Sequence, residues 1–278
     1  MVRQRAGVRG SPIAHSLSPV LHRAAYASLG VEWDYDGVEL PAGALTAHVA
    51  GLGPEWRGLS LTNPLKEEAL ALADRASELA RTLAAANTLV HEADGSWSAD
   101  NTDVAGVEVA LREAGVEHAP AAVVVGSGAT ARSALAALRG LGARRVWLAV
   151  RDAVRPETAA VAATLGLDLE ACRIGQWPHG VSVVIGTVPP TAYAGALGAL
   201  PECGPAAVVL DCVYGHGPSP LLGVAREIGW TTVPGTEMLL HQAVRQVRLM
   251  TGLQPPVGPM REALADALAA RDIATAPD

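Results

Sequence analysis

The stretch Ala121-Ala122-Val123-Val124-Val125-Gly126-Ser127-Gly128-Ala129-Thr130-Ala131 decides the fold. Its first five residues are apolar without interruption, which is typical of a strand buried on both faces of a parallel sheet. The spacing Gly-x-Gly-x-x-Ala follows, at the start of a helix expected over residues 130–141. Such glycines allow a tight turn and let the backbone approach a pyrophosphate at the helix N-terminus. The alternative is a glycine turn that binds no ligand. The predicted dinucleotide-binding loop contains Gly126, Ser127, Gly128, Ala129 and Thr130.

Further buried strands are expected downstream, alternating with helices. They lie at residues 145–150, 169–173, 181–186 and 206–211. This alternation predicts an α/β fold with a doubly wound parallel sheet, in which ligands bind beyond the carboxyl ends of the strands.

Two arginines follow the second strand of this sheet. An acidic residue at that strand end would suit the ribose 2′-hydroxyl of NAD, whereas an arginine can bind the 2′-phosphate of NADP. Arg151 and Arg155 therefore favour NADP. Asp152 leaves NAD as the less favoured alternative, and both arginines could simply be solvated.

The chain before this sheet also alternates strands and helices. Strands are expected at residues 6–10, 31–38 and 56–61, a long helix with a break near Asp74 at 67–83, and a hairpin around Asp94-Gly95.

The loop before the first helix contains two serines. Ser18 is expected to be the N-cap and Pro19 the first helical residue. With Ser16 alongside, this helix N-terminus could hold a carboxylate or phosphate. Plain helix capping is the alternative.

A second polar loop follows the strand at 56–61. Ser60 and Thr62 lie two residues apart, so their hydroxyls share one face of an extended chain, and Lys66 follows one turn later. Two hydroxyls and an amine could bind a polyol and transfer a proton. The alternative is a strand-to-helix turn with a solvated lysine.

Composition limits the possible functions. A chain of 278 residues is long enough for two domains, and a net charge of −7 gives no basis for binding nucleic acid. The N-terminus has no signal-peptide core, and there is no apolar run of 18 residues to span a membrane. Three cysteines without paired or metal-ligand spacing suggest a reducing cytoplasm and no bound metal.

Seven segments in one order match the motif pattern of a single family. They are Ser11-Pro12-Ile13 with His15-Ser16-Leu17-Ser18-Pro19 and His22; Gly58 with Thr62, Pro64 and Lys66; Ala86-Asn87-Thr88; Asn101-Thr102-Asp103 with Gly106; Gly126-x-Gly128-Ala129; Asp211-x-Val213-Tyr214 with Pro220-Leu221; and Gly235-x-x-Met238-Leu239 with Gln242. Through them the chain resembles the shikimate dehydrogenase family over essentially its whole length.

The resemblance implies a reversible, NADPH-linked reduction of 3-dehydroshikimate to shikimate, with Lys66 and Asp103 as the catalytic pair. Ser16 and Ser18 would hold the substrate carboxylate. The other implied substrate contacts are Ser60, Thr62, Asn87, Asp103, Tyr214 and Gln242. The expected cofactor contacts are the glycine loop with Arg151, Arg155, Thr187 and Gly235.

The resemblance also implies two domains. Residues 1–102 plus 238–278 would form a discontinuous substrate domain, and residues 103–237 a Rossmann-type NADP-binding domain, with the active site in the cleft between them. The only expected partners are small molecules, and the protein would be a monomer or a homodimer.

Three departures from the family pattern affect these expectations. Ser60 replaces the usual asparagine, Val150-Arg151-Asp152 replaces Asn-Arg-Thr, and Pro234-Gly235 replaces Gly-Gly. The first leaves a quinate or amino-shikimate dehydrogenase as an alternative. A non-catalytic NADP-binding regulatory protein and a folate dehydrogenase are more distant alternatives. Retention of Lys66 and Asp103 argues against the former, and the Ser-x-Ser pair together with the segment from Met238 to Gln242 argues against the latter.

Overall fold

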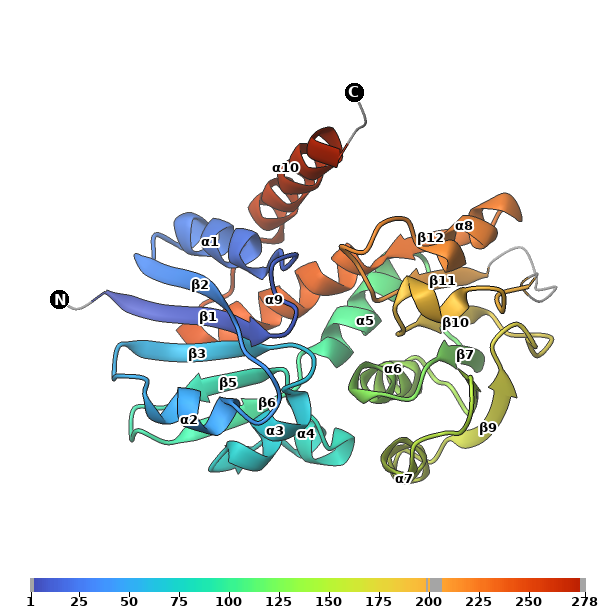
Figure 1. The fold of residues 1–278 in the computed structure, drawn as a ribbon, viewed down its shortest axis with the longest axis horizontal. Helices are drawn as coiled ribbons and strands as arrows, with labels where there is room; N and C mark the ends of the chain where they lie inside the picture. The colour runs from blue at the N-terminus through green and yellow to red at the C-terminus, as the bar shows by residue number, and fades with distance from the viewer. Residues whose placement is uncertain (1–2, 199, 201–206, 276–278) are drawn as a thin grey trace. The chain divides into compact units, whose positions relative to one another are not determined.

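The computed structural model describes residues 3–198, 200 and 207–275 (Figure 1). The chain divides into two compact units. The first contains residues 1–81, 85–102 and 240–278, and the second contains residues 82–84 and 103–239. Cys203 and the expected strand start at Ala206 lie outside the described residues.

The first unit is built on a six-stranded mixed sheet with the strand order β2-β1-β3-β5-β6-β4. The strands are β1 (Gln4–Gly10), β2 (Trp33–Glu39), β3 (Trp56–Leu61), β4 (Arg75–Ala76), β5 (Thr88–His91) and β6 (Trp97–Asp100). β1 pairs in parallel with β2 and β3, whereas β5 pairs antiparallel with β3 and β6. The expected hairpin around Asp94-Gly95 is therefore confirmed.

Short helices cover one face of this sheet: α2 (Leu45–Ala50), α3 (Lys66–Leu72) and α4 (Glu78–Leu83) (Figure 1). Leu59 and Leu61 of β3 are buried in their shared core. Because side chains alternate along a strand, Ser60 is directed to the opposite face. The break expected near Asp74 in the helix over residues 67–83 is confirmed, since the short strand β4 separates α3 from α4.

The opposite face carries α1 (Ser18–Leu29), α9 (Gly235–Thr251) and α10 (Val257–Thr275). Of α9, residues 240–251 belong to this unit. α1 packs against α10 and β2.

The second unit is built on a parallel sheet with the strand order β12-β11-β10-β7-β8-β9. Its strands are β7 (Ala121–Val125), β8 (Arg145–Val150), β9 (Asp168–Arg173), β10 (Val183–Gly186), β11 (Val208–Asp211) and β12 (Thr231–Pro234). Counted from β7 and read from β9, this is the order 3-2-1-4-5-6 of dinucleotide-binding folds. The predicted α/β fold with a doubly wound sheet is confirmed.

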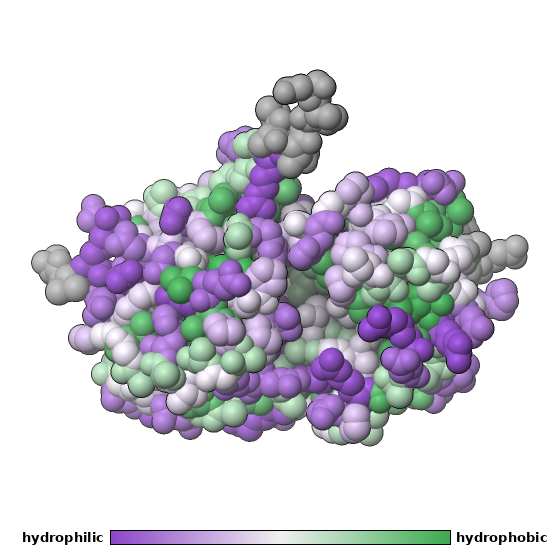
Figure 2. All heavy atoms as spheres, in the orientation of Figure 1, coloured by the Kyte–Doolittle hydropathy of each residue, from purple (hydrophilic) through white to green (hydrophobic). Residues whose placement is uncertain are grey.

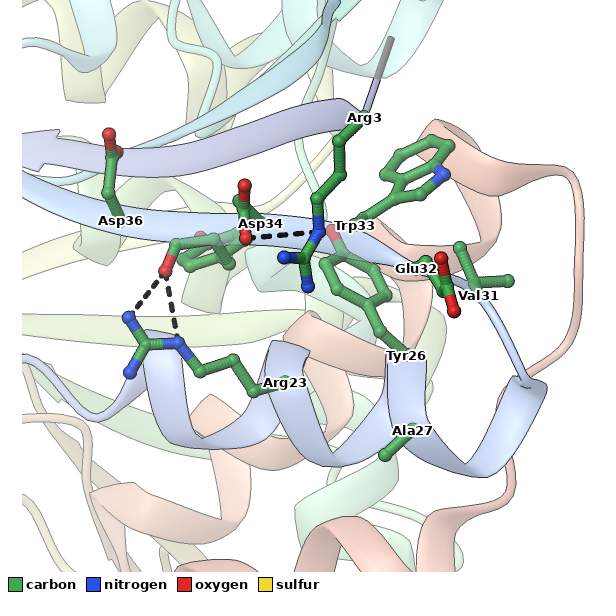
Figure 3. Close-up of a pocket in the computed structure, with 10 residues that line it drawn as sticks. Arg3, Arg23, Tyr26, Ala27, Val31, Glu32, Trp33, Asp34 and Asp36 are labelled. Atoms are coloured by element: carbon green, nitrogen blue, oxygen red, sulfur yellow. Dashed lines mark hydrogen bonds and ion pairs between the residues drawn. The ribbon is translucent and has the colours of Figure 1, made fainter. Parts of the chain in front are cut away.

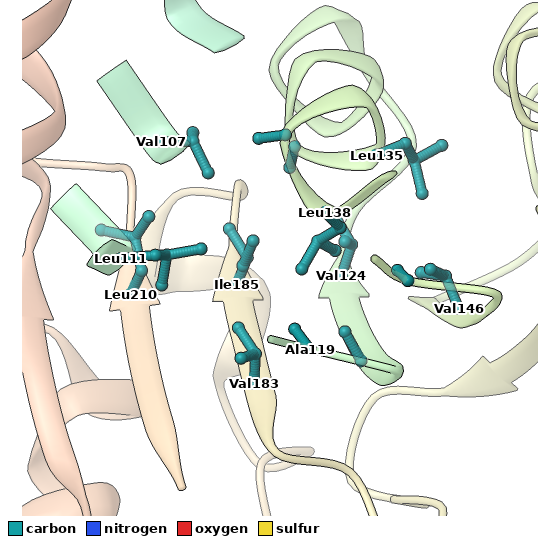
Figure 4. Packing of buried hydrophobic residues seen from close by; sticks show 14 of the residues in the cluster. Val107, Leu111, Ala119, Val124, Leu135, Leu138, Val146, Val183, Ile185 and Leu210 are labelled. Carbon is teal, nitrogen blue, oxygen red and sulfur yellow. The ribbon is translucent and has the colours of Figure 1, made fainter. Parts of the chain in front are cut away.

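Each strand at the centre of this sheet buries both of its faces. Val124 and Ile185 face α5 (Asp103–Glu113) and α6 (Ala129–Gly140), where Leu111 and Leu138 meet them (Figure 4). Their neighbours Val123 and Val184 face a second core. That core includes residues of α8 (Pro220–Glu227) and of the 3₁₀ helix η1 (Pro190–Tyr193). Continuous apolar strands are thus explained by cover on both faces.

Apolar residues at the surface are dispersed. On the face drawn in Figure 2, hydrophilic and hydrophobic residues are interspersed over both units. Among the described residues, the exposed large hydrophobic side chains are Val38, Val109, Ile228 and Leu253, which lie on different segments. No helix in the described part of the chain has both the length and the apolar character needed to span a membrane.

His22 anchors α1 on the first sheet. Its ring is fully buried and stacks on Tyr35 of β2, with the ring centroids 4.0 Å apart. Nε2 lies 3.2 Å from Gln246 Oε1, and Nδ1 lies 3.4 Å from the Tyr26 hydroxyl. Burial lowers the pKa of His22 from 6.5 to about 3, although the hydrogen bond to Gln246 opposes the shift. The imidazole is therefore neutral near pH 7.

This shift makes stability depend on pH. The unfolded chain takes up a proton on His22 below pH 6.5, whereas the folded chain does so only near pH 3. The stabilising contribution is complete above pH 6.5 and is lost as the pH falls towards 3, at up to ~1.4 kcal/mol per pH unit. In urea unfolding between pH 7 and 4.5, we expect His22→Asn to show a shallower loss of stability than wild type. His179→Asn, at an exposed histidine, is the matched control and should keep the wild-type slope. Equal slopes for His22→Asn and wild type would contradict the assignment.

Candidate active site

The loop that leads into α1 differs from expectation. α1 begins at Ser18, with Leu17 in the N-cap position, so the prediction that Ser18 caps the helix is wrong. Instead Ser16 Oγ accepts a hydrogen bond of 3.3 Å from the Ser18 backbone N–H. Ser16 is half-buried and Ser18 is buried. Ser16 therefore satisfies one of the N–H groups that a helix start leaves without an intrahelical partner.

Backbone hydrogen bonds bring Thr62, Lys66 and Asn87 together in the first unit. The Thr62 N–H donates to Arg9 O at 2.9 Å, which extends the pairing of β3 with β1 past Leu61. Leu61 N–H donates to Asn87 O at 2.7 Å, and Ala86 N–H donates to Lys66 O at 2.8 Å. Thr62 and Lys66 are both half-buried. The polar loop that follows β3 thus lies next to the segment that contains Asn87.

Asn87 is buried within a set of directional hydrogen bonds. Its Oδ1 accepts from the Thr102 N–H at 2.8 Å and from Thr88 Oγ1 at 2.8 Å. Its Nδ2 lies 2.9 Å from Thr102 Oγ1 and 3.4 Å from Gln242 Oε1. Because the Thr102 N–H can only donate, the oxygen and nitrogen of the Asn87 amide are assigned without ambiguity. Asn87 and Gln242, both predicted substrate contacts, are therefore neighbours.

Ser60 is buried with both of its hydrogen-bonding roles in use. Its hydroxyl accepts from Tyr35 Oη at 2.6 Å and donates to Gln246 Oε1 at 2.7 Å. Its predicted contact with a substrate stays a prediction.

The sequence analysis missed Tyr35 and Gln246. Gln246 lies four residues after Gln242 on α9, so the two side chains share one face of the helix. That spacing of two glutamines on a largely apolar helix was the available signal. Tyr35 gave no comparable signal, because its partner Ser60 lies 25 residues away.

The second unit carries the other predicted residues. Asp103 is buried and begins α5. Tyr214 is half-buried in the loop after β11. Gly235 begins α9, and a side chain there would collide with Asp211 O, 2.6 Å from the position of its Cβ.

The glycine loop after β7 has the backbone geometry that the motif predicts. Gly126 has a φ of +110°, which side chains rarely tolerate, and a Cβ there would lie 2.6 Å from Thr187 Oγ1. Thr187 is held in turn by donating to Val125 O at 2.6 Å. Gly128 holds the N-cap position of α6 and presents no side chain over the helix start. These features fit a pyrophosphate bound at the N-terminus of α6.

Ser127 joins this loop to the predicted arginine loop. Its Oγ accepts from the Arg155 N–H at 2.8 Å, and its carbonyl accepts from Thr158 Oγ1 at 2.9 Å. Arg155 is the N-cap residue of α7 (Pro156–Thr164). Arg151 and Arg155 are both exposed, as is Asp152. The loop that carries both arginines is thus joined to the glycine turn through the Arg155 backbone.

A pocket of about 570 Å³ lies elsewhere on the first unit, between α1 and the edge strand β2 (Figure 3). Arg23 donates two hydrogen bonds to the carbonyl of Tyr35, and Arg3 pairs with Asp34 at 3.3 Å. These cationic groups cover an edge strand that could otherwise pair with another chain. The predicted substrate-binding residues do not line this pocket.

Comparison with known proteins identifies the family. A model of the shikimate dehydrogenase substrate binding domain matches residues 8–89, and one of the shikimate 5′-dehydrogenase C-terminal domain matches residues 235–265. The shikimate dehydrogenase (NADP(+)) of Rubrobacter xylanophilus is 36% identical over 275 residues, covering 93% of this chain and 94% of the relative.

Solved structures agree. The shikimate dehydrogenase of Mycobacterium tuberculosis has a TM-score of 0.82 and 38% identity, covering 95% of this chain and 99% of that one. The shikimate 5-dehydrogenase of Thermus thermophilus, solved in complex with NADP(H) and shikimate, has a TM-score of 0.81 and 32% identity, with the same two coverages. The chain therefore belongs to the shikimate dehydrogenase family, as its motifs predict.

Proposed function

We propose that this chain catalyses the reversible, NADPH-dependent reduction of 3-dehydroshikimate to shikimate, a step of aromatic amino acid biosynthesis. The observation that carries the proposal is the position of Lys66. It begins α3, and its carbonyl is hydrogen-bonded to the residue that precedes Asn87. The relatives named above are shikimate dehydrogenases, and one of them binds shikimate with NADP(H).

Lys66 is also distinctive in composition. Of the 21 basic residues Lys and Arg in the sequence, Lys66 is the only lysine. A chain that otherwise uses arginine throughout keeps an ammonium at this position. Arginine cannot release a proton in a protein, whereas lysine can, so the choice favours a role in proton transfer.

The proposed chemistry divides between the cofactor and the chain. When bound, NADPH supplies the hydride that reduces the substrate carbonyl. The oxygen of that carbonyl gains negative charge during hydride transfer. The Lys66 ammonium is proposed to stabilise this charge and to donate a proton to the same oxygen. Asp103 is proposed as the second member of the catalytic pair.

The remaining predicted residues bind and orient the substrate. Ser16 and Ser18 are proposed to hold its carboxylate at the start of α1, where N–H groups and the helix dipole favour an anion. Its ring hydroxyls are assigned to Thr62, Asn87, Asp103 and Gln242, with Tyr214 nearby. Thr62, Asn87 and Gln242 are supported by their proximity in the first unit.

NADP is the proposed cofactor, held by the glycine loop with Thr187 and Gly235. Arg151 and Arg155 are the proposed ligands of the 2′-phosphate, since a guanidinium can bind phosphate through two parallel hydrogen bonds. The contact between Ser127 and the Arg155 backbone supports this assignment. A cytoplasmic location and a monomeric or homodimeric state stay predictions from the sequence.

The residue at position 60 supports a second candidate function. Ser60 stands where the family usually has asparagine, and its hydroxyl is bonded to Tyr35 and Gln246. A quinate dehydrogenase is therefore the alternative.

The reaction is tested directly with purified protein. Shikimate and quinate are each supplied with NADP and with NAD, and formation of reduced cofactor is followed by absorbance. We expect the highest kcat/KM for shikimate with NADP. Preference for quinate would favour the alternative, and turnover of neither substrate would contradict the proposed function.

Replacement of Lys66 tests its catalytic role. We expect Lys66→Ala to lower kcat by about 10²–10⁴-fold with little change in the Kd for shikimate, because the ammonium acts on charge that develops during the reaction. Lys66→Arg retains the positive charge but not the proton donor, so it should remain impaired. Glu67→Ala, at the exposed neighbour, is the control. A near-native kcat for Lys66→Ala would remove the lysine from the mechanism.

Replacement of Arg151 tests cofactor selection. Loss of a charge-assisted contact to the 2′-phosphate should raise the KM for NADP by about 10- to 100-fold, equivalent to ~1.5–3 kcal/mol, and leave the KM for NAD nearly unchanged. Arg226→Ala, at another exposed arginine of the same unit, should change neither constant. Equal effects on both cofactors would show that Arg151 does not contact the 2′-phosphate.

A further inference from the structure

A continuous line of buried polar groups runs through the first unit from β2 to Asn87. It passes through Tyr35, Ser60 and Gln246, which are 2%, 4% and 1% exposed. Buried polar groups cost stability unless they are paired, so a line of this kind needs an explanation beyond packing.

Gln246 is the centre of this line, because its amide makes four hydrogen bonds. Its Nε2 donates to the Asn87 carbonyl at 3.1 Å and to Thr88 Oγ1 at 3.1 Å. Its Oε1 accepts from Ser60 Oγ at 2.7 Å and lies 3.2 Å from His22 Nε2. The carbonyl of Asn87 can only accept, so the nitrogen of Gln246 must face it.

The orientation of that amide fixes the direction of every other bond in the line. Ser60 must donate to the Gln246 oxygen, which requires the Ser60 oxygen to accept from Tyr35. For the same reason His22 carries its hydrogen on Nε2.

Thr88 connects Gln246 to the side chain of Asn87. The Thr88 hydroxyl accepts from Gln246 Nε2 and donates to Asn87 Oδ1 at 2.8 Å. Gln246 therefore holds both ends of Asn87, its backbone carbonyl directly and its side-chain oxygen through Thr88. With its oxygen held by Thr88 and by the Thr102 N–H, the Asn87 amide directs its nitrogen to Thr102 Oγ1 and Gln242 Oε1.

We propose that Gln246 is a positioning residue, which, together with the Thr102 N–H, fixes the orientation of the Asn87 amide for substrate binding. The proposal rests on the proposed function, in which Asn87 binds a ring hydroxyl. Gln246 acts through Asn87 and Thr88 and is not itself assigned a contact with the substrate. Ser60 donates to the oxygen of Gln246, and Tyr35 donates in turn to the oxygen of Ser60.

Gln246→Met tests the proposal, because methionine has a similar length and lacks the amide. We expect the Kd for shikimate to rise about tenfold, as for loss of one or two hydrogen bonds, with the Kd for NADP unchanged. Gln254→Met makes the same chemical change at an exposed position of the first unit and should alter neither constant.

A double-mutant cycle separates positioning from general stability. Asn87→Ala should weaken shikimate binding strongly in wild type but much less in the Gln246→Met background, because both changes remove the same oriented amide. Equal fold-changes in the two backgrounds would overturn the proposal.

Two further measurements test the proposal if Gln246→Met does not fold or if the protein does not turn over shikimate. Tyr35→Phe keeps the ring stacked on His22 but removes the first donor, and should weaken shikimate binding about two- to threefold, so it replaces Gln246→Met if that variant does not fold. The side-chain ¹⁵N–¹H signals of Asn87 report its orientation without any ligand. They should shift and broaden in either variant, and unchanged signals would overturn the proposal. If wild type turns over no shikimate, the proposed function fails, whereas the NMR result still decides the role of Gln246.

Discussion

A buried carboxamide is tolerated only when all of its polar atoms are paired, and the first unit is arranged to meet this requirement at Gln246. Its four partners come from α1, β3 and the segment that begins β5. β3 and β5 are held by their pairing and by the core beneath them, and α1 is held by packing against α10 and β2. The Gln246 amide thus fixes the positions of α1, β3 and the start of β5 relative to one another. Asn87 precedes β5 and accepts a hydrogen bond from this amide.

The second unit meets a different constraint, which is the close approach of the Gly126 backbone to Thr187. Gly126 adopts a conformation that suits glycine, against a Thr187 side chain that leaves no room for a Cβ. Ser127 then joins the turn to the loop that contains Arg155. Movement of the arginine loop would break its hydrogen bond to the glycine turn, so in the proposed cofactor site this serine would couple selection of the 2′-phosphate to pyrophosphate binding.

Local features of this kind were predictable from the sequence. β3 spans the residues expected for it, the hairpin forms around Asp94-Gly95, and the glycine loop lies between a buried strand and a helix. One local prediction was wrong, because Ser18 is not the N-cap of α1. The break expected near Asp74 is confirmed, since β4 separates α3 from α4 and pairs with β6.

The network around Gln246 could not be derived in the same way. Ser60 and Gln246 are 186 residues apart, and their hydrogen bond depends on how α9 packs across the sheet. A glutamine on a helix is more often a solvated residue. The spacing from Gln242 marks Gln246 in the sequence, but its burial and its hydrogen bond to Asn87 are known only from the tertiary structure.

Ser60, which replaces the usual asparagine of the family, is part of the hydrogen-bond network around Gln246. Its short side chain accepts from Tyr35 and donates to Gln246, so the hydroxyl supports the network that orients Asn87. An asparagine at this position would bring a larger amide into a buried site whose partners are already paired, and it would require a different arrangement of Tyr35 or Gln246. The chemical change at residue 60 thus bears on substrate choice only indirectly, through the orientation of Asn87.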